Sequence, residues 1–290
     1  VLREILAGLG AEVLCRGRSA AFVPVDTEAI RPEDVALARV WAATERCDAI
    51  VSADGDGDRP LVADERGEWF RGDVAGIFTA RFLDADRVVT PVSSNTALER
   101  CGWFEGTVRT RIGSPYVIAG MAEAAAAGAR RVVGFEANGG FLTWSEATRD
   151  GRTLPALPTR DAAIVALALL LAARRRGMSL SELRASLPAR YTASDRLKAF
   201  PCDLARERLA ALRAGGAVAM SAQFPGLGEV LAVDETDGLR ITFSNQEVVH
   251  LRPSGNAPEL RCYNEAASPE RAAALNRDCL ARLEAWRTAE

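Results

Sequence analysis

This 290-residue chain has only one histidine and no closely spaced pair of cysteines. The single histidine, His250, lies in a strand-like stretch, so the sequence supports no Ser-His-Asp catalytic arrangement. No two of the six cysteines form a C-x-x-C pair, which argues against both a zinc site and a disulfide framework. The sequence also contains no P-loop and no strand-linked G-x-G-x-x-G fingerprint. We therefore expect reduced thiols and a cytoplasmic protein.

The chain also lacks an excess of positive charge and a long apolar run. Its formal net charge of -3 and pI of about 5.5 give no basic footprint, so we expect no nucleic-acid partner. The longest apolar run, residues 162–173, is too short to cross about 30 Å of hydrocarbon, and the arginines that follow it suit the end of a buried helix. The first residues mix apolar and charged positions, which indicates an amphipathic helix rather than a signal peptide. We expect no membrane partner.

Strand-like apolar runs alternate with helical patterns over the first two thirds of the chain, which predicts largely parallel sheets covered by helices. The expected strands are residues 11–17, 48–54, 87–92 and 130–137, and the expected helices are 31–47, 74–85 and 115–129. The pattern then changes to a loop-like stretch at 191–203, a helix at 204–216, alternating strands over 228–253 and a final helix that starts at Ser268.

The predicted fold class is therefore α/β, with two α/β domains of mixed, largely parallel sheets followed by a C-terminal α+β domain. We expect the boundaries to give a metal-binding domain at 1–85, a second α/β domain at 86–190 and the α+β domain at 191–290. Ligands in such sheets gather beyond the carboxyl ends of the strands, so polar residues at these ends are the first candidates for a site.

The first candidate is the stretch "DGDGDR" that follows a short apolar run. Asp54, Asp56 and Asp58 stand at alternate positions, and the glycines between them let the backbone curl until the three carboxylates converge. Converging carboxylates need a cation, and hard oxygen ligands suit Mg²⁺ or Ca²⁺. Arg59, directly behind them, offers a rigid fork of donors for an anionic group.

Three other interpretations of this stretch are open. Asp and Gly are common in plain turns, but a D-G-D-G-D-R run after an apolar strand is not. An EF-hand calcium loop matches at four positions, with Glu65 as the twelfth, but it requires a glycine where Arg59 stands. An aspartate-nucleophile phosphatase also has D-x-D after a strand, although Thr or Val is expected where Asp58 stands.

The second candidate is the loop "RPSGNAPELR" between two strand-like runs. Ser254, Gly255 and Asn256 offer hydroxyl, backbone N–H and amide donors, and Arg252 and Arg261 stand at the two strand ends. Such a loop can wrap a phosphate group with charge-assisted hydrogen bonds. It contains no catalytic group, so we interpret it as a handle for the substrate.

The third candidate is "GFEANGG", in which Glu136 ends an apolar strand and Asn138 follows between small residues. A carboxylate and an amide in this position suit neighbouring sugar hydroxyls. A helix N-terminus that uses either residue as a cap would explain the pattern almost as well.

Taken in chain order, the three motifs resemble those of the α-D-phosphohexomutase superfamily, which includes the phosphomannomutases and phosphoglucomutases. "DGDGDRP" resembles the magnesium loop of that family, "FEANGG" is a variant of its sugar loop, and "RPSGNAPELR" resembles its phosphate loop. The resemblance covers nearly the whole chain. It implies an isomerase of carbohydrate metabolism that moves a phosphoryl group between O1 and O6 of a hexose phosphate, mannose or glucose, through a bisphosphate intermediate.

The resemblance also implies the role of each residue. Asp54, Asp56 and Asp58 would bind Mg²⁺, and Arg59 would neighbour the transferred phosphoryl group. The substrate would be held by Glu136, Asn138, Arg252, Ser254, Gly255, Asn256 and Arg261. The family's phosphoserine stands in a Thr-Ala-Ser-His-Asn-Pro loop of a preceding domain, and no such loop occurs in this sequence. We therefore expect this chain to be inactive alone; the alternative is a non-catalytic module that binds a metal and sugar phosphates.

Overall fold

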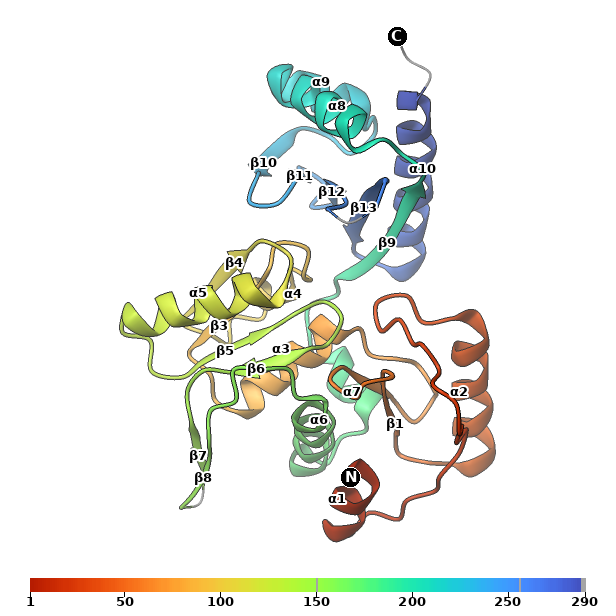
Figure 1. Ribbon diagram of the computed structural model, residues 1–290, viewed down its shortest axis with the longest axis vertical. Coiled ribbons are helices and arrows are strands. Elements are labelled where there is room, and N and C mark those ends of the chain that lie inside the picture. Colours follow the sequence, from red (N-terminus) through yellow and green to blue (C-terminus); the bar gives the residue numbers. More distant parts are fainter. Residues whose placement is uncertain (150, 256, 288–290) are drawn as a thin grey trace. The chain divides into compact units, whose positions relative to one another are not determined.

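The computed structural model describes residues 1–149, 151–255 and 257–287 (Figure 1). Its internal contacts divide the chain into two compact units. The first unit comprises Val1–Ser94, Leu98–Val108 and Gly113–Leu187, and the second comprises Asn95–Ala97, Arg109–Ile112 and Pro188–Glu290. A further boundary at residue 85 within the first unit stays a prediction.

The first unit opens with two helices and a hairpin, namely α1 (Leu2–Gly8), α2 (Pro32–Glu45), β1 (Ile50–Ala53) and β2 (Pro60–Ala63). β1 and β2 pair antiparallel, with Ala53 opposite Pro60. The strand expected at 11–17 is wrong, because these residues form no regular structure and lie largely exposed. An apolar run becomes a strand only where a neighbour takes up its backbone hydrogen bonds, and here β2 fills that role for β1.

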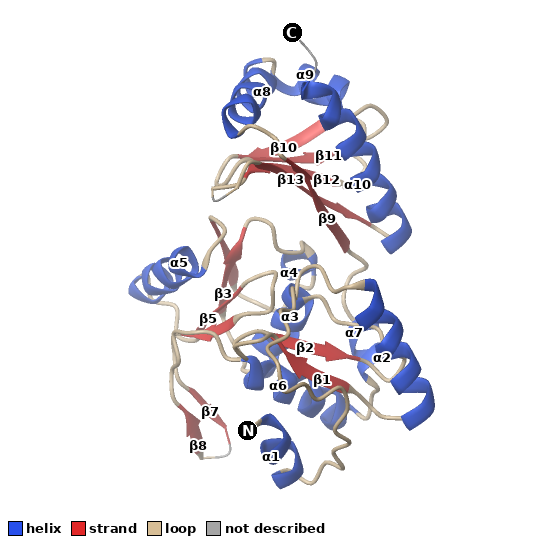
Figure 2. Cartoon of the chain, turned by 45° about the vertical axis from the view of Figure 1, so that its right-hand side comes forward, coloured by secondary structure: helices blue, strands red, loops and turns tan. Residues whose placement is uncertain are grey.

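The central sheet of the first unit has the strand order β4-β3-β5-β6. Its strands are β3 (Arg87–Pro91), β4 (Gly106–Thr110), β5 (Val132–Phe135) and β6 (Phe141–Thr143). β3 and β5 run parallel, whereas β5 and β6 form an antiparallel hairpin. Helix α5 (Ser114–Ala126) packs on β3 and β5, and α3 (Gly72–Phe82) packs on β5 from the other side of the sheet (Figures 1 and 2).

The longest apolar run forms helix α6 (Ala162–Arg176), which packs against α3 and β2. The Asp161 carboxylate caps its first turn by accepting from the N–H groups of Ala163 and Ile164, and Gly177 ends the helix in the left-handed conformation. A buried helix was predicted here and is confirmed. Within the described residues, no helix is both long and apolar enough to cross a membrane. The remaining elements of this part are α4 (Ala97–Arg100), β7 (Ala147–Arg149), β8 (Arg152–Leu154) and α7 (Leu180–Ala185).

The second unit contains a five-stranded antiparallel sheet with the order β10-β11-β12-β13-β9. The strands are β9 (Tyr191–Lys198), β10 (Val230–Asp234), β11 (Leu239–Phe243), β12 (Val248–Pro253) and β13 (Glu259–Ala266). The loop expected at 191–203 is therefore wrong over β9. This polar segment is a strand at the edge of the sheet, where charged side chains are common.

Helices cover one face of this sheet (Figure 2). They are α8 (Cys202–Ala214), α9 (Gly216–Gln223), α10 (Pro269–Glu284) and the 3₁₀ turn η1 (Ala285–Arg287). Leu251 and Cys262 pack into the core beneath them, so the alternating positions Arg252 and Arg261 point to the opposite face. The predicted N-cap is confirmed, since the Ser268 hydroxyl accepts a hydrogen bond at the start of α10. The predicted class, α/β followed by a C-terminal α+β domain, is confirmed, with β3 and β5 as the parallel pair in a mixed sheet.

Candidate functional site

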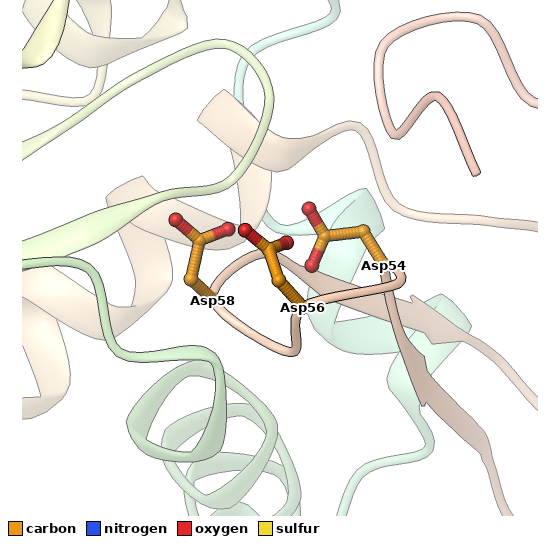
Figure 3. A group of neighbouring side chains, drawn as sticks. All are labelled: Asp54, Asp56 and Asp58. Carbon is orange, nitrogen blue, oxygen red and sulfur yellow. The ribbon is translucent and has the colours of Figure 1, made fainter. Parts of the chain in front are cut away.

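Three aspartates converge in the loop that joins β1 to β2 (Figure 3). Asp54, Asp56 and Asp58 each place a carboxylate oxygen within 4.8 Å of the others. The loop is closed by two hydrogen bonds, in which the Asp54 N–H donates to the Arg59 carbonyl and the Arg59 N–H donates to the Asp54 carboxylate, both at 3.1 Å. Gly57 has a φ of 78°, a left-handed conformation that favours glycine. The spacing of glycines and aspartates therefore builds a hairpin loop with its carboxylates together.

The crowding of these carboxylates has an electrostatic cost. Burial raises the pKa of Asp54, and repulsion from Asp58 and Asp56 adds to this, while the hydrogen bond from the Arg59 N–H opposes it. The Arg59 Nε lies 3.6 Å from both the Asp54 and the Asp58 carboxylates. One guanidinium group at this distance offsets part of the charge of three carboxylates.

The residues present fit a divalent cation. In the described part of the chain, the Oδ1 atom of Asp58 is buried and accepts no hydrogen bond, so it is a buried oxygen that a cation would satisfy. The donor set is all carboxylate, which suits Mg²⁺ or Ca²⁺ rather than a soft metal.

The sugar-loop candidates lie in the hairpin between β5 and β6. The Glu136 N–H donates to the Gly140 carbonyl at 3.0 Å, and the Asn138 side-chain oxygen accepts from the Gly140 N–H at 3.0 Å. Gly139 takes a positive φ of 92° and permits the tight turn. Neither polar residue caps a helix, so that interpretation is wrong. Glu136 is buried, with 4% of its surface exposed.

Arg160 joins the metal loop to the sugar loop. Its Nε donates to the Glu136 carboxylate at 2.9 Å, and its Nη1 donates to the Asp58 carboxylate at 3.1 Å. Both loops belong to the first unit, so the structure brings these two candidate sites together. Sequence analysis missed Arg160. The available signal was its position directly before the helix cap Asp161, beside the apolar run.

The phosphate-loop candidates lie in the second unit. Arg252 and Ser254 stand at the end of β12, Gly255 follows, and Arg261 stands on β13. The Ser254 N–H donates to the Glu259 carbonyl at 2.8 Å and closes the loop across the two strands. Asn256 lies outside the described residues.

Arginines form a row across three neighbouring strands of this sheet. Arg252 on β12 stands opposite Arg261 on β13, which stands opposite Arg196 on β9. Like charges in directly opposed positions destabilise a sheet unless an anion lies near them. The Glu259 carboxylate lies 3.4 Å from Arg196 and 3.6 Å from Arg261 and offsets part of the repulsion. Sequence analysis missed Arg196, because its segment was interpreted as a loop.

Arg252, at one end of the row of arginines, is held by Asp237 in the turn between β10 and β11. Its Nε lies 2.9 Å from the Asp237 carboxylate, which also accepts from the Ile112 N–H at 3.0 Å. The Nε–H of Arg252 is not aligned for a hydrogen bond, so this contact is an ion pair. His250 donates from Nε2 to the Asp237 carbonyl at 2.7 Å. The histidine is thus a buried strand residue whose hydrogen bond helps to hold Asp237, the ion-pair partner of Arg252, beside the phosphate loop.

Comparison with known proteins places this chain in one family. The model for phosphoglucomutase/phosphomannomutase, alpha/beta/alpha domain III, matches residues 72–191, and the model for the C-terminal domain matches residues 197–281. A phosphomannomutase of Sinorhizobium fredii is 46% identical over 272 residues, which cover 94% of this chain and 57% of the relative.

Two solved structures share the fold. A Thermus thermophilus protein assigned as a phosphomannomutase superposes with a TM-score of 0.69 at 22% identity, over 98% of this chain and 57% of that one. N-acetylphosphoglucosamine mutase of Aspergillus fumigatus, solved in complex with GlcNAc-6P and magnesium, gives a TM-score of 0.55 at 16% identity, over 81% of this chain and 52% of that one.

The chain belongs to the phosphoglucomutase/phosphomannomutase family. The resemblance inferred from the three motifs is thereby confirmed. The chain spans about half the length of the curated relatives it matches.

Proposed function

We propose that this chain is the metal- and sugar-phosphate-binding part of a phosphohexomutase of the phosphomannomutase or phosphoglucomutase type. The observation that carries the proposal is the double contact of Arg160 with Asp58 and Glu136. A mutase must hold a phosphoryl group beside a metal ion and orient the sugar that receives it, and the two loops joined by Arg160 would do both at one place. The reaction would move a phosphoryl group between O1 and O6 of mannose or glucose phosphate through a bisphosphate.

The metal would be Mg²⁺, held by Asp54, Asp56 and Asp58. Their carboxylate oxygens support this choice, and magnesium is present in the complex of the Aspergillus fumigatus enzyme. When bound, the cation would offset negative charge on the transferring phosphoryl group. Arg59, whose Nε makes no hydrogen bond in the described residues, would donate to a phosphoryl oxygen.

The substrate would be held at its two ends. Glu136, oriented by its hydrogen bond from Arg160, would accept hydrogen bonds from sugar hydroxyls, with the amide of Asn138 beside it. The non-reacting phosphate would bind to Arg252, Ser254, Gly255, Asn256 and Arg261. We add Arg196 to this set, because it continues the row of guanidinium groups.

The phosphoserine of the reaction would come from a segment outside these residues. Ser194, which follows Thr-Ala as in the family's serine loop, is part of strand β9 opposite Tyr263 and is unsuited to that role. We therefore propose that the chain alone binds hexose phosphate but does not turn it over. A cytoplasmic location is supported by six free thiols.

Isothermal titration of mannose 1-phosphate and glucose 1-phosphate, with and without Mg²⁺, tests the proposal. We expect the Arg261→Ala variant to weaken binding by about tenfold or more, because it loses charge-assisted hydrogen bonds. Arg277→Ala, which removes an exposed arginine on α10, is the matched control and should bind as the wild type does. Equal affinities in all three proteins would refute the assignment of the phosphate loop. A measured mutase rate from these 290 residues alone would refute the need for an external phosphoserine.

A further inference from the structure

A cavity of about 540 Å³ in the first unit is lined mainly by arginine and aromatic side chains. Its volume falls within the range of roughly 300–1,000 Å³ that is usual for small-molecule sites. The arginines are Arg81, Arg130, Arg131, Arg149, Arg175 and Arg176. The carboxylates are Asp84, Asp86 and Glu105. Among the described residues, twice as many guanidinium groups as carboxylates therefore face one cavity, in a chain whose net charge is -3.

The cavity is remote from the metal and sugar loops. Asp86 and Arg131 precede the parallel strands β3 and β5, whereas Glu136 follows β5. The cavity and the sugar loop therefore lie at opposite ends of these strands. Helix α3 begins against the sugar loop, where a Cβ on Gly72 would lie 2.1 Å from the Gly139 backbone, and ends at the cavity. Its 11 residues rise about 16 Å. A ligand in the cavity would not occupy the proposed active site.

The carboxylates of the cavity already have partners. Asp84 accepts from the Arg149 side chain at 2.7 Å. Asp86 accepts from the backbone N–H groups of Arg130 and Arg131, each at 3.1 Å. Glu105 lies 3.4 Å from the Arg130 side chain. The acids are thus engaged by two of the six arginines and by the backbone.

The other four arginines lack such a partner in the described part of the chain. Among residues 1–149, 151–255 and 257–287, no carboxylate lies within ion-pair distance of Arg131, Arg175 or Arg176. The C-terminal end of α6 favours basic residues, which explains why Arg174 to Arg176 occur together. It does not explain why Arg81 and Arg131, from other elements, face the same cavity while Arg174 does not.

Aromatic rings hold several of these guanidinium groups in place. Arg81 lies over the Trp103 ring at 4.1 Å, and Arg149 and Arg175 lie over Phe82 at 4.7 Å and 5.1 Å. An arginine stacked on a ring keeps its N–H donors free along the edge of its plane. Less conformational entropy is then lost when an anion binds.

We propose that this cavity binds a small anion that carries two or more phosphoryl groups, at a site separate from the carboxylates of the metal loop. The surplus of guanidinium groups requires several negative charges, and the arginine fork matches phosphate oxygens in bidentate geometry. The cavity exceeds the size of a bare diphosphate, so the natural ligand would be a phosphorylated organic molecule.

Titration with inorganic pyrophosphate in the absence of divalent metal tests this site. The double variant Arg131→Ala/Arg176→Ala should bind about tenfold more weakly or worse, since it removes charge-assisted hydrogen bonds from two exposed side chains. Arg174→Ala removes the same charge from the same helix end but not from the cavity, and its affinity should equal that of the wild type. Equal weakening in both variants would mean general attraction to a basic surface and would overturn the proposal.

Amide NMR shifts locate the bound pyrophosphate. We expect the shifts to concentrate at residues 130–132 and 172–177, and to persist in the Arg261→Ala variant. Shifts confined to residues 252–261 would mean that pyrophosphate occupies the phosphate loop instead, and they would overturn the proposal while supporting the proposed function. No binding to the wild type at millimolar pyrophosphate would also overturn it.

Discussion

His250 should make the second unit sensitive to acid. Its side chain is 1% exposed on β12, its Nε2–H donates to the Asp237 carbonyl at 2.7 Å, and its ring stacks on Tyr263. Burial lowers the pKa of His250 to about 4; the Asp237 contact opposes this shift, and the nearby Arg240 and Arg252 add to it. The folded protein therefore holds this imidazole neutral.

The magnitude follows from proton linkage. Above pH 6.5, the ordinary value for histidine, both folded and unfolded states carry a neutral ring and stability is fully present. Between pH 6.5 and the folded pKa of about 4, the unfolded state binds a proton that the folded state does not, so acid favours unfolding. The free energy of unfolding should fall by about 2 kcal/mol between pH 7 and pH 5 from this group alone.

Urea unfolding of the wild type and of His250→Gln at pH 7 and pH 5 measures this contribution. Glutamine keeps an N–H donor for the Asp237 carbonyl but does not titrate, and both proteins share every other titrating group. We expect the wild type to be the more stable protein at pH 7, with this difference shrinking by about 2 kcal/mol at pH 5. A difference that stays constant with pH would show that the imidazole is not held neutral by burial and would refute the reasoning.

Two further predictions concern the charged centres. Asp58→Asn should weaken Mg²⁺ binding by about tenfold or more in calorimetric titration, because it removes one of three carboxylates. Arg160→Gln should instead tighten Mg²⁺ binding severalfold, because it removes a cation 3.1 Å from Asp58. Weaker Mg²⁺ binding in both variants would contradict the expectation for Arg160. Glu265→Gln should lower the free energy of unfolding by about 3–5 kcal/mol in urea, because it leaves the buried Arg190 without its ion-pair partner. Glu270→Gln, at an exposed site on α10, is the control, and a loss as small as the control's would contradict this expectation.

The local parts of the site were predictable from the sequence. Alternate aspartates separated by glycines converge because residues two apart share a side of an extended segment, and Gly57 supplies the left-handed turn. Glu136 was expected directly after an apolar strand, and it lies there. Such features depend on a few neighbouring residues, so sequence periodicity and turn chemistry are sufficient to predict them.

The long-range parts were not predictable in the same way. Arg160 contacts Asp58 across 102 positions of sequence, and a lone arginine in a sequence is usually solvated. The pairing of β1 with β2 decides that the metal loop is a hairpin, and an apolar run does not reveal the direction of its partner. Only the pairing of β9 with β13 identifies Arg196 as a candidate site residue, because its neighbours in the sequence are typical of a polar loop.

Charge balance explains why local clusters, rather than the net charge, indicate the ligands of this chain. Around Arg160, four carboxylates face the two guanidinium groups of Arg160 and Arg59, which leaves the excess of negative charge that a divalent cation would neutralise. In the cavity near the start of β3 and β5, six guanidinium groups of the described residues face three carboxylates, an excess of the other sign. The two imbalances largely cancel in the net charge of -3. Because an uncompensated cluster costs free energy wherever it is held together, each is explained most simply by a ligand of opposite charge.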